Sequence, residues 1–131
     1  MNANTQRQRI AGSAGAIELL VDSPVGAPVG VAVLSHPHPL FGGTMDNKVV
    51  QTLARAFVQC GWQAVRFNFR GVGASEGPYD EGRGELEDLL SVVQQMAPSG
   101  PLALAGFSFG AFVTSHAVAR LASQRDLRQV V

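Results

Sequence analysis

The stretch "LALAGFSFGAFV" (residues 102–113) places one serine between two glycines, where an apolar run gives way to a helical pattern. Residues 106–110, "GFSFG", match the pattern G-x-S-x-G, in which a strand turns directly into a helix. The tight turn exposes the serine, and the glycines two residues to either side relieve crowding. It also points the first unpaired N–H groups of the helix at a reaction partner, where they can stabilise an oxyanion. The pattern therefore predicts Ser108 as a nucleophile; a plain turn with Ser108 as a helix N-cap is the alternative.

Strand and helix patterns alternate along the rest of the chain. The hydrophobic periodicity predicts a hairpin over residues 6–24 that turns at residues 13–15, then strands within 29–37, 62–69, 101–107 and from 127. Helices are predicted over residues 46–61, with Asp46 as N-cap, and over 84–96 and 109–122. This alternation indicates an α/β protein, with a mostly parallel sheet covered by helices on both faces and an antiparallel hairpin at one edge. Ligands bind such sheets at the carboxyl ends of the strands, where the loops after Leu34, Phe69 and Phe107 converge.

The composition indicates a single globular domain over residues 1–131. Hydrophobic residues make up 46%, charged residues 15%, and ten basic residues balance ten acidic ones, so no bulk field attracts nucleic acid. No apolar run approaches the ~18 residues of a membrane span, and residues 1–14 lack the apolar segment of a signal peptide. The one cysteine, Cys60, suits a reducing compartment and is predicted to pack in the core. We expect a soluble cytoplasmic protein that binds neither nucleic acid nor membrane.

Four stretches of the chain resemble the α/β-hydrolase superfamily, specifically its small bacterial dienelactone-hydrolase-like and esterase-like branch. "SHPHPLFGGTMDNKVVQTLARAF" (35–57) is similar to the oxyanion loop and first helix of that branch, and "RFNFRGVGASEG" (66–77) to the loop after its fourth strand. "YDEGRGELEDL" (79–89) resembles the lead into the second helix, and "GFSFG" (106–110) sits where the family keeps its nucleophile. The resemblance implies a serine hydrolase that acts on an ester or related acyl bond of a small molecule, without an organic cofactor.

The same resemblance assigns the oxyanion hole. It implies that the N–H of Phe109, the residue after the nucleophile, is one donor and that the loop "HPHPLFGG" (36–43) supplies the second. Pro37 and Pro39 have no N–H to donate, which leaves His38 and Leu40 as candidates. The sequence does not choose between them.

None of the three histidines is expected to be the catalytic base. His116 lies eight residues beyond Ser108, or ~12 Å along a helix, which is too far for proton transfer. We expect it to be a partly buried residue on a helix face. His36 and His38 lie in the loop that approaches from the oxyanion side, where a base would compete with the oxyanion site.

In the α/β-hydrolase order the triad acid follows the nucleophile and the histidine follows the acid. The resemblance places both beyond Val131, since Asp126, the one aspartate after Ser108, falls in a helix-end loop. We therefore expect residues 1–131 to be the N-terminal portion of a longer hydrolase, an incomplete domain that is inactive alone. "LRQVV" (127–131) ends without a covering helix or a charge after it, which predicts self-association through an exposed sheet edge.

Two other function classes stay open. "GVGASEG" (71–77) follows a strand and is a weak variant of the dinucleotide fingerprint, but Pro78 and two more glycines precede the next helical pattern. A Rossmann loop opens a helix at once. A non-catalytic scaffold of the same fold would need neither acid nor base, but it would not need the glycines of the elbow either.

Charged residues near the predicted site have structural explanations beside functional ones. Arg70 and Ser75 are candidates for binding a substrate carboxylate or phosphate, although Arg70 is better explained by pairing with an acidic neighbour. Glu85, Glu87 and Asp88 lie at a helix start, where they favour the helix dipole and are expected to face solvent. No spacing of His, Cys and Asp indicates a metal site.

Overall fold

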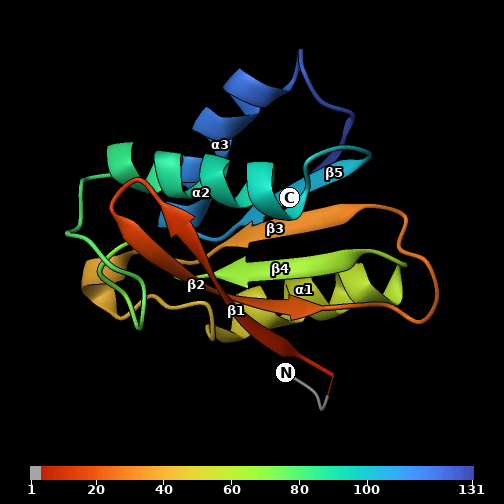
Figure 1. Ribbon diagram of the computed structural model, residues 1–131, viewed down its shortest axis with the longest axis horizontal. Helices are drawn as coiled ribbons and strands as arrows, with labels where there is room; N and C mark the ends of the chain where they lie inside the picture. Colours follow the sequence, from red (N-terminus) through yellow and green to blue (C-terminus); the bar gives the residue numbers. More distant parts are fainter. Residues whose placement is uncertain (1–3) are drawn as a thin grey trace.

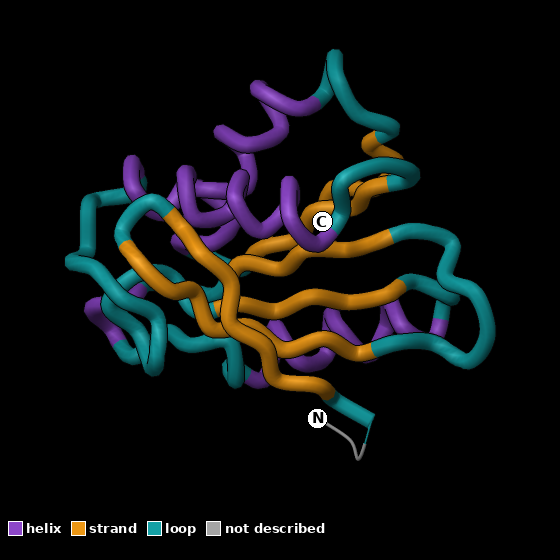
Figure 2. The backbone as a smooth tube through the Cα atoms, viewed as in Figure 1, coloured by secondary structure: helices purple, strands orange, loops and turns teal. Residues whose placement is uncertain are grey.

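The computed structural model describes residues 4–131 as a six-stranded sheet with α-helices on both faces (Figures 1 and 2). The strands are β1 (Gln6–Gly12), β2 (Gly15–Asp22), β3 (Val31–Ser35), β4 (Gln63–Phe67), β5 (Leu102–Gly106) and β6 (Leu127–Val130). The helices are α1 (Lys48–Gln59), α2 (Arg83–Met96) and α3 (Phe109–Leu121), with a short 3-10 turn η1 (Pro39–Phe41). Residues 1–14 are predicted to lack a signal peptide, and the first three of them lie outside the described residues.

The strands are ordered β1-β2-β4-β3-β5-β6 across the sheet. β3 pairs in parallel with β4 and β5, β5 pairs in parallel with β6, and β2 pairs antiparallel with β1 and β4. The predicted α/β fold, with its mostly parallel sheet and N-terminal antiparallel hairpin, is therefore confirmed. The hairpin turn is tighter than predicted: Gly12 pairs with Gly15, so the turn contains Ser13 and Ala14 alone.

The two faces of the sheet are covered by different helices: α1 lies on one face, and α2 and α3 lie on the other (Figure 1). Side chains alternate between these faces along each strand. Small residues such as Ala32 and Ala64 face α1 and let it pack closely. Larger residues such as Val33 and Val65 face α2 and α3, where the main hydrophobic core lies. β6 forms one edge of the sheet and β1 the other.

The start of α1 differs from the prediction by one residue. Asn47, and not Asp46, caps the helix, because its side-chain oxygen accepts the N–H groups of Val49 and Val50 at 2.9 and 3.2 Å. The Asp46 carboxylate instead lies 3.5 Å from the guanidinium of Arg66. That long-range contact is not visible in the local cap pattern.

The prediction that Cys60 packs in the core is wrong, since its side chain is exposed. The buried positions of α1 are Val50, Ala54 and Phe57. Cys60 follows the last helical residue and serves as the C-cap through its backbone, so it falls outside that stripe. In residues 4–131, no helix has both the length and the apolar character needed to cross a bilayer.

The prediction that Arg70 pairs with an acidic neighbour is confirmed. Its backbone N–H and guanidinium donate to the Asp88 carboxylate, with the shortest side-chain contact at 3.0 Å. The prediction that Glu85 and Asp88 face solvent is wrong, because they are 0% and 1% exposed. The loop before α2 folds over the first turn of the helix, and Glu85 accepts the N–H groups of Asp80 and Gly82 at 2.9 Å.

Candidate active site

Ser108 occupies a sharp corner between β5 and α3. Its backbone has φ 58° and ψ −117°, which is the left-handed half of conformational space that a residue with a Cβ rarely adopts. The residue is exposed, and its side chain makes no capping hydrogen bond to the helix. The geometry is therefore that of the predicted nucleophile elbow and not that of a simple N-cap.

Both glycines of the elbow are sterically required. A Cβ on Gly106 would lie 2.4 Å from the carbonyl oxygen of Gly110, and a Cβ on Gly110 would lie 2.1 Å from the carbonyl oxygen of Ser35. Real Cβ atoms do not approach backbone this closely. The second contact shows that α3 starts directly against the end of β3, so the elbow is held by tertiary packing as well as by its own turn.

Replacing Gly110 by alanine separates this packing effect from helix propensity. Alanine is favoured over glycine inside a helix by about 1 kcal/mol, so propensity alone predicts stabilisation. The contact with Ser35 predicts instead a loss of about 1–3 kcal/mol, as for other overpacking substitutions. Urea unfolding measures the difference, and Ala119→Gly, at an exposed position of the same helix, calibrates the propensity. A more stable Gly110→Ala variant would contradict the close approach.

The loops after β3, β4 and β5 converge at the carboxyl end of the sheet, as predicted. The ring of His38 lies 4.7 Å from the ring of Phe109 and 5.3 Å from that of Tyr79, measured between centroids. The backbone N–H of Phe107 also donates to the carbonyl oxygen of Ser35 at 3.2 Å. The first and third loops are thus brought into contact beside Ser108.

The two candidate donors of the oxyanion loop have different surroundings. The N–H of Leu40 donates to Nδ1 of His38 at 3.1 Å and is already engaged. The backbone N–H groups of His38 and Phe109 have no acceptor within residues 4–131. A bound carbonyl oxygen could therefore accept hydrogen bonds from the N–H groups of His38 and Phe109 without breaking an existing bond.

His36 ties the oxyanion loop to the end of β4. Its Nε2 accepts the N–H of Phe69 at 3.1 Å, so Nδ1 carries the proton and donates to the carbonyl oxygen of Pro37 at 2.6 Å. Burial lowers the pKa of His36 from 6.5 to about 4, which keeps the ring neutral near pH 7. With both nitrogens engaged inside the protein, His36 has a structural role and is not a base for Ser108.

The depressed pKa of His36 predicts acid sensitivity. Between pH 6.5 and about 4 the His36 ring is protonated in the unfolded chain but stays neutral in the folded state. The stability that is present above pH 6.5 therefore falls as pH is lowered. The shift corresponds to a loss of about 3 kcal/mol over this window. Urea unfolding between pH 7 and 4 measures it. His36→Gln, which retains an acceptor for Phe69, should flatten the profile; an unchanged profile in this variant would contradict the prediction.

The other sequence candidates lie away from catalytic contacts. His116 is exposed with its ring against Phe112, so the expectation of partial burial is wrong. Asp126 is exposed and pairs with Arg128 at 3.1 Å. Within residues 4–131, no hydrogen bond joins the hydroxyl of Ser108 to a histidine.

Two residues of β4 and its end were missed by the sequence analysis. Asn68 accepts the N–H of Met45 at 2.9 Å, and the buried Arg66 donates to the carbonyl oxygen of Met45 at 3.0 Å. Together they hold the segment that follows the oxyanion loop. The available signal was the presence of two polar residues in the otherwise apolar run "AVRFNF" (64–69).

The glycine-rich loop does not have the geometry of a dinucleotide site. α2 begins only at Arg83, well after the loop, and the loop closes on itself through a bond from Gly71 N–H to the Ser75 carbonyl oxygen. The Ser75 hydroxyl is buried and donates to the carbonyl oxygen of Asn68 at 2.6 Å, so it is not available to a substrate. In the part of the chain that the structure describes, no three His, Cys, Asp or Glu residues gather as metal ligands would.

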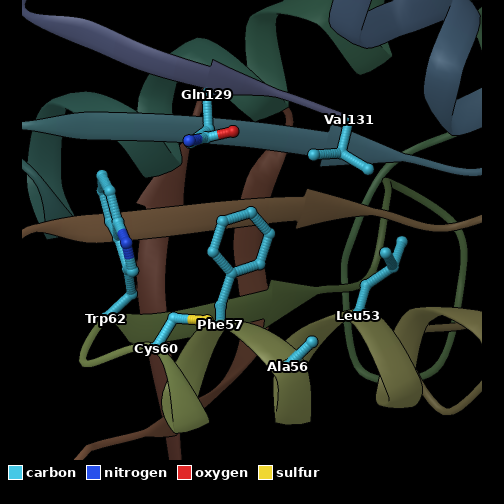
Figure 3. Close-up of a pocket in the computed structure, with 7 residues that line it drawn as sticks. All are labelled: Leu53, Ala56, Phe57, Cys60, Trp62, Gln129 and Val131. Carbon is cyan, nitrogen blue, oxygen red and sulfur yellow. The ribbon is translucent and has the colours of Figure 1, made fainter.

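An apolar groove of about 290 Å³ lies between α1 and β6 (Figure 3). Phe57 and Trp62 line one side, and Gln129 and Val131 the other. None of its lining residues belongs to the three loops around Ser108. The groove is therefore separate from the candidate active site.

A sheet of this order with an exposed, positive-φ serine between β5 and α3 defines an α/β-hydrolase. The family model for serine aminopeptidases of group S33 matches residues 30–131, and the chain belongs to that family.

Individual relatives agree with this assignment. The chain is similar to an α/β serine hydrolase without lid from Xanthomonas campestris (41% identity, 93% of this chain and 59% of that one, TM-score 0.84). An α/β serine hydrolase homologue from Coxiella burnetii has 41% identity, over 98% of this chain and 63% of that one, with TM-score 0.82. An uncharacterized protein of Rickettsia prowazekii (strain Madrid E) is 40% identical over 94 residues, which are 69% of this chain and 40% of the relative. The chain thus spans less than two thirds of the length of each.

Proposed function

We propose that Ser108 is the nucleophile of a serine hydrolase that cleaves an ester or related acyl bond in a small molecule. The observation that carries the proposal is the exposed serine held at φ 58° between two glycines that steric contact requires. Such a turn holds the hydroxyl clear of the sheet and beside the N-terminus of α3, where a substrate carbonyl can reach both. Membership of a hydrolase family supports the same class of reaction.

The reaction proceeds through an acyl-enzyme. The Ser108 oxygen attacks the carbonyl carbon as its proton passes to a general base, and the carbonyl oxygen becomes an oxyanion. The tetrahedral intermediate collapses, the alcohol leaves with the proton from the base, and water hydrolyses the acyl-enzyme by the reverse sequence. We propose that the base and its acid come from the part of the full-length gene product after Val131, in line with the order of triad residues in α/β-hydrolases.

For the oxyanion hole we propose the N–H groups of Phe109 and His38. The Phe109 N–H is the first of α3 and is aided by the positive end of the helix dipole. The His38 N–H has no acceptor among the described residues, whereas a Leu40 donor would first have to release Nδ1 of His38. Removing one such donor typically slows acyl transfer by about 10²–10³-fold.

A non-catalytic scaffold is the second candidate. The observation in its favour is that no histidine within residues 4–131 is hydrogen-bonded to Ser108. Against it stands the strained backbone of Ser108, because strain of this kind persists mainly where function requires it.

Labelling with a fluorophosphonate probe tests the proposal on the full-length gene product. Activated serines react with such probes and ordinary serines do not, so we expect a single adduct that peptide mapping places on Ser108. Ser108→Ala should abolish labelling, and Ser115→Ala, at an exposed serine of the same helix, should leave it unchanged. An unlabelled wild-type protein, or an adduct elsewhere, would favour the scaffold.

Two further properties belong to the proposal. We propose that the protein acts in the cytoplasm, in line with its single cysteine. For residues 1–131 expressed alone we propose self-association through β6, since this strand lies at the sheet edge of the described chain and Val130 is 54% exposed.

A further inference from the structure

Five aromatic rings form a continuous chain of contacts beside Ser108, which we call the aromatic rim: His38, Phe41, Tyr79, Phe109 and Phe112. His38 contacts Phe41 at 4.8 Å and Phe109 at 4.7 Å between ring centroids. Phe109 in turn lies 6.0 Å from Tyr79 and 6.4 Å from Phe112. The rings come from three loops or helix starts that are distant in sequence, and Phe109 directly follows the proposed nucleophile.

The outer members of the aromatic rim are not core residues. Phe41 is 84% exposed and Phe112 is 53% exposed. Two neighbours in the same loops, Leu40 and Phe107, are 63% and 42% exposed. Large apolar side chains gathered on one exposed surface are characteristic of binding sites. Leaving them exposed forgoes the stabilisation that their burial in the core would give.

The arginines at this end of the sheet are already paired. The Arg70 guanidinium is held by Asp88 at 3.0 Å and by the Ser13 hydroxyl at 3.0 Å. Arg66 is fully buried and donates to the carbonyl oxygen of Met45. The exposed Arg83 lies 3.8 Å from Glu81. Arg66 and Arg70 are therefore not free to bind a carboxylate or phosphate of a substrate, whereas Arg83 is 80% exposed and its pair with Glu81 is screened by solvent.

Two acidic residues, Glu81 and Glu85, lie near Tyr79 of the aromatic rim. The pKa of the Tyr79 hydroxyl is raised by loss of solvation and then by the charges of Glu85 and Glu81. A group of negative charges that disfavours the tyrosinate also disfavours an anionic substrate at the same place. The surface therefore combines apolar rings with acidic neighbours on the side of Tyr79.

We propose that the substrate is an uncharged ester with a flat apolar group, such as an aryl or phenylalkyl group, that packs on the aromatic rim. This inference rests on the proposed function of Ser108 and adds the class of substrate. Rings pack on one another in offset or edge-to-face geometry, which the exposed faces of Phe41 and Phe112 can offer. Esters that carry a carboxylate are disfavoured, because Arg66 and Arg70 are engaged inside the protein and Glu81 and Glu85 lie beside Tyr79.

Kinetics with matched esters of the full-length gene product test the proposal. We expect kcat/KM to be higher for ethyl 3-phenylpropanoate than for ethyl hexanoate by about three- to tenfold, the size of a ring–ring contact. The kcat/KM for phenyl butyrate should exceed that for phenyl hydrogen succinate, which has the same leaving group and a similar length but an extra negative charge. In the Phe41→Ala/Phe112→Ala double variant the preference for the phenyl ester should vanish through a higher KM for that ester.

Val25→Ala is the matched control, because Val25 is fully exposed in the loop between β2 and β3, at the other end of β3. It should leave the preference intact. Equal rates for the two ethyl esters, or a preference for the succinate, would overturn the inference.

A binding measurement separates failure of the substrate class from failure of the proposed nucleophile. In the Ser108→Ala variant, titration with N-phenylacetamide followed by NMR should shift the ring protons of Phe41 and Phe112, and succinate should not. Fluorophosphonate labelling without these shifts and without ester preference rejects the aromatic rim and keeps the hydrolase. Shifts without labelling keep the aromatic rim as a binding surface and reject the hydrolase.

Discussion

Ester hydrolysis by the full-length gene product should fall by a factor on the order of 10⁶ when Ser108 is replaced by alanine, as when the nucleophile of a serine hydrolase is removed. In the proposed mechanism this change removes the oxygen that forms the acyl-enzyme, and the proposed oxyanion donors alone would support only a small residual rate. The measurement is kcat for a neutral ester with the purified variant and its parent.

The control for this result is Ser115→Ala on the same helix. Its hydroxyl is exposed and donates to the carbonyl oxygen of Phe112 at 2.7 Å, so its removal tests loss of a helical serine without loss of the nucleophile. Its kcat should stay within a factor of about two of the parent, as expected for a surface substitution. A Ser108→Ala variant that keeps more than a tenth of the activity would reject the assignment.

Asp88→Ala is expected to lower the free energy of unfolding by about 3–5 kcal/mol, because it leaves a buried partner charge without compensation. Asp88 is 1% exposed, and it accepts the backbone N–H of Arg70 as well as two bonds from the guanidinium. Without it the loop after β4 loses its anchor on α2. Urea unfolding at pH 7 measures the loss.

The matched control is Glu87→Ala. The Glu87 carboxylate lies 3.9 Å from the same Arg70 guanidinium but its side chain is 61% exposed. A solvent-screened pair of this kind contributes at most about 1 kcal/mol. If the two variants lose the same stability, the buried location of Asp88 is not what matters.

Local patterns were sufficient for the elements and the elbow. The unbroken apolar runs of β3 and β5 and the helical spacing of α1 and α2 report burial along a single segment, so their prediction needed no knowledge of neighbours. The two glycines around Ser108 similarly report a constraint that arises mostly within one turn. Even there, the contact of Gly110 with Ser35 of β3 is long-range and was not foreseen.

Charged and polar groups were predicted less well. Glu85 and Asp88 have the sequence position of solvent-facing residues at a helix start, but the preceding loop covers them. Cys60 has the spacing of a core residue, but it lies one position past the end of α1 and is exposed. Burial of these groups depends on which loop folds over which helix, and periodicity within the helix does not contain that information.

The order of strands and helices along the chain, the position of Ser108 at a strand–helix corner and the need for glycine at position 106 follow from the amino-acid pattern, because each depends on residues close along the chain. Which N–H of the oxyanion loop stays free, which acid holds Arg70, and which rings surround the serine depend on contacts between segments far apart in sequence. These contacts form only when the sheet brings its carboxyl-end loops together, so the surroundings of Ser108 had to be read from the folded chain.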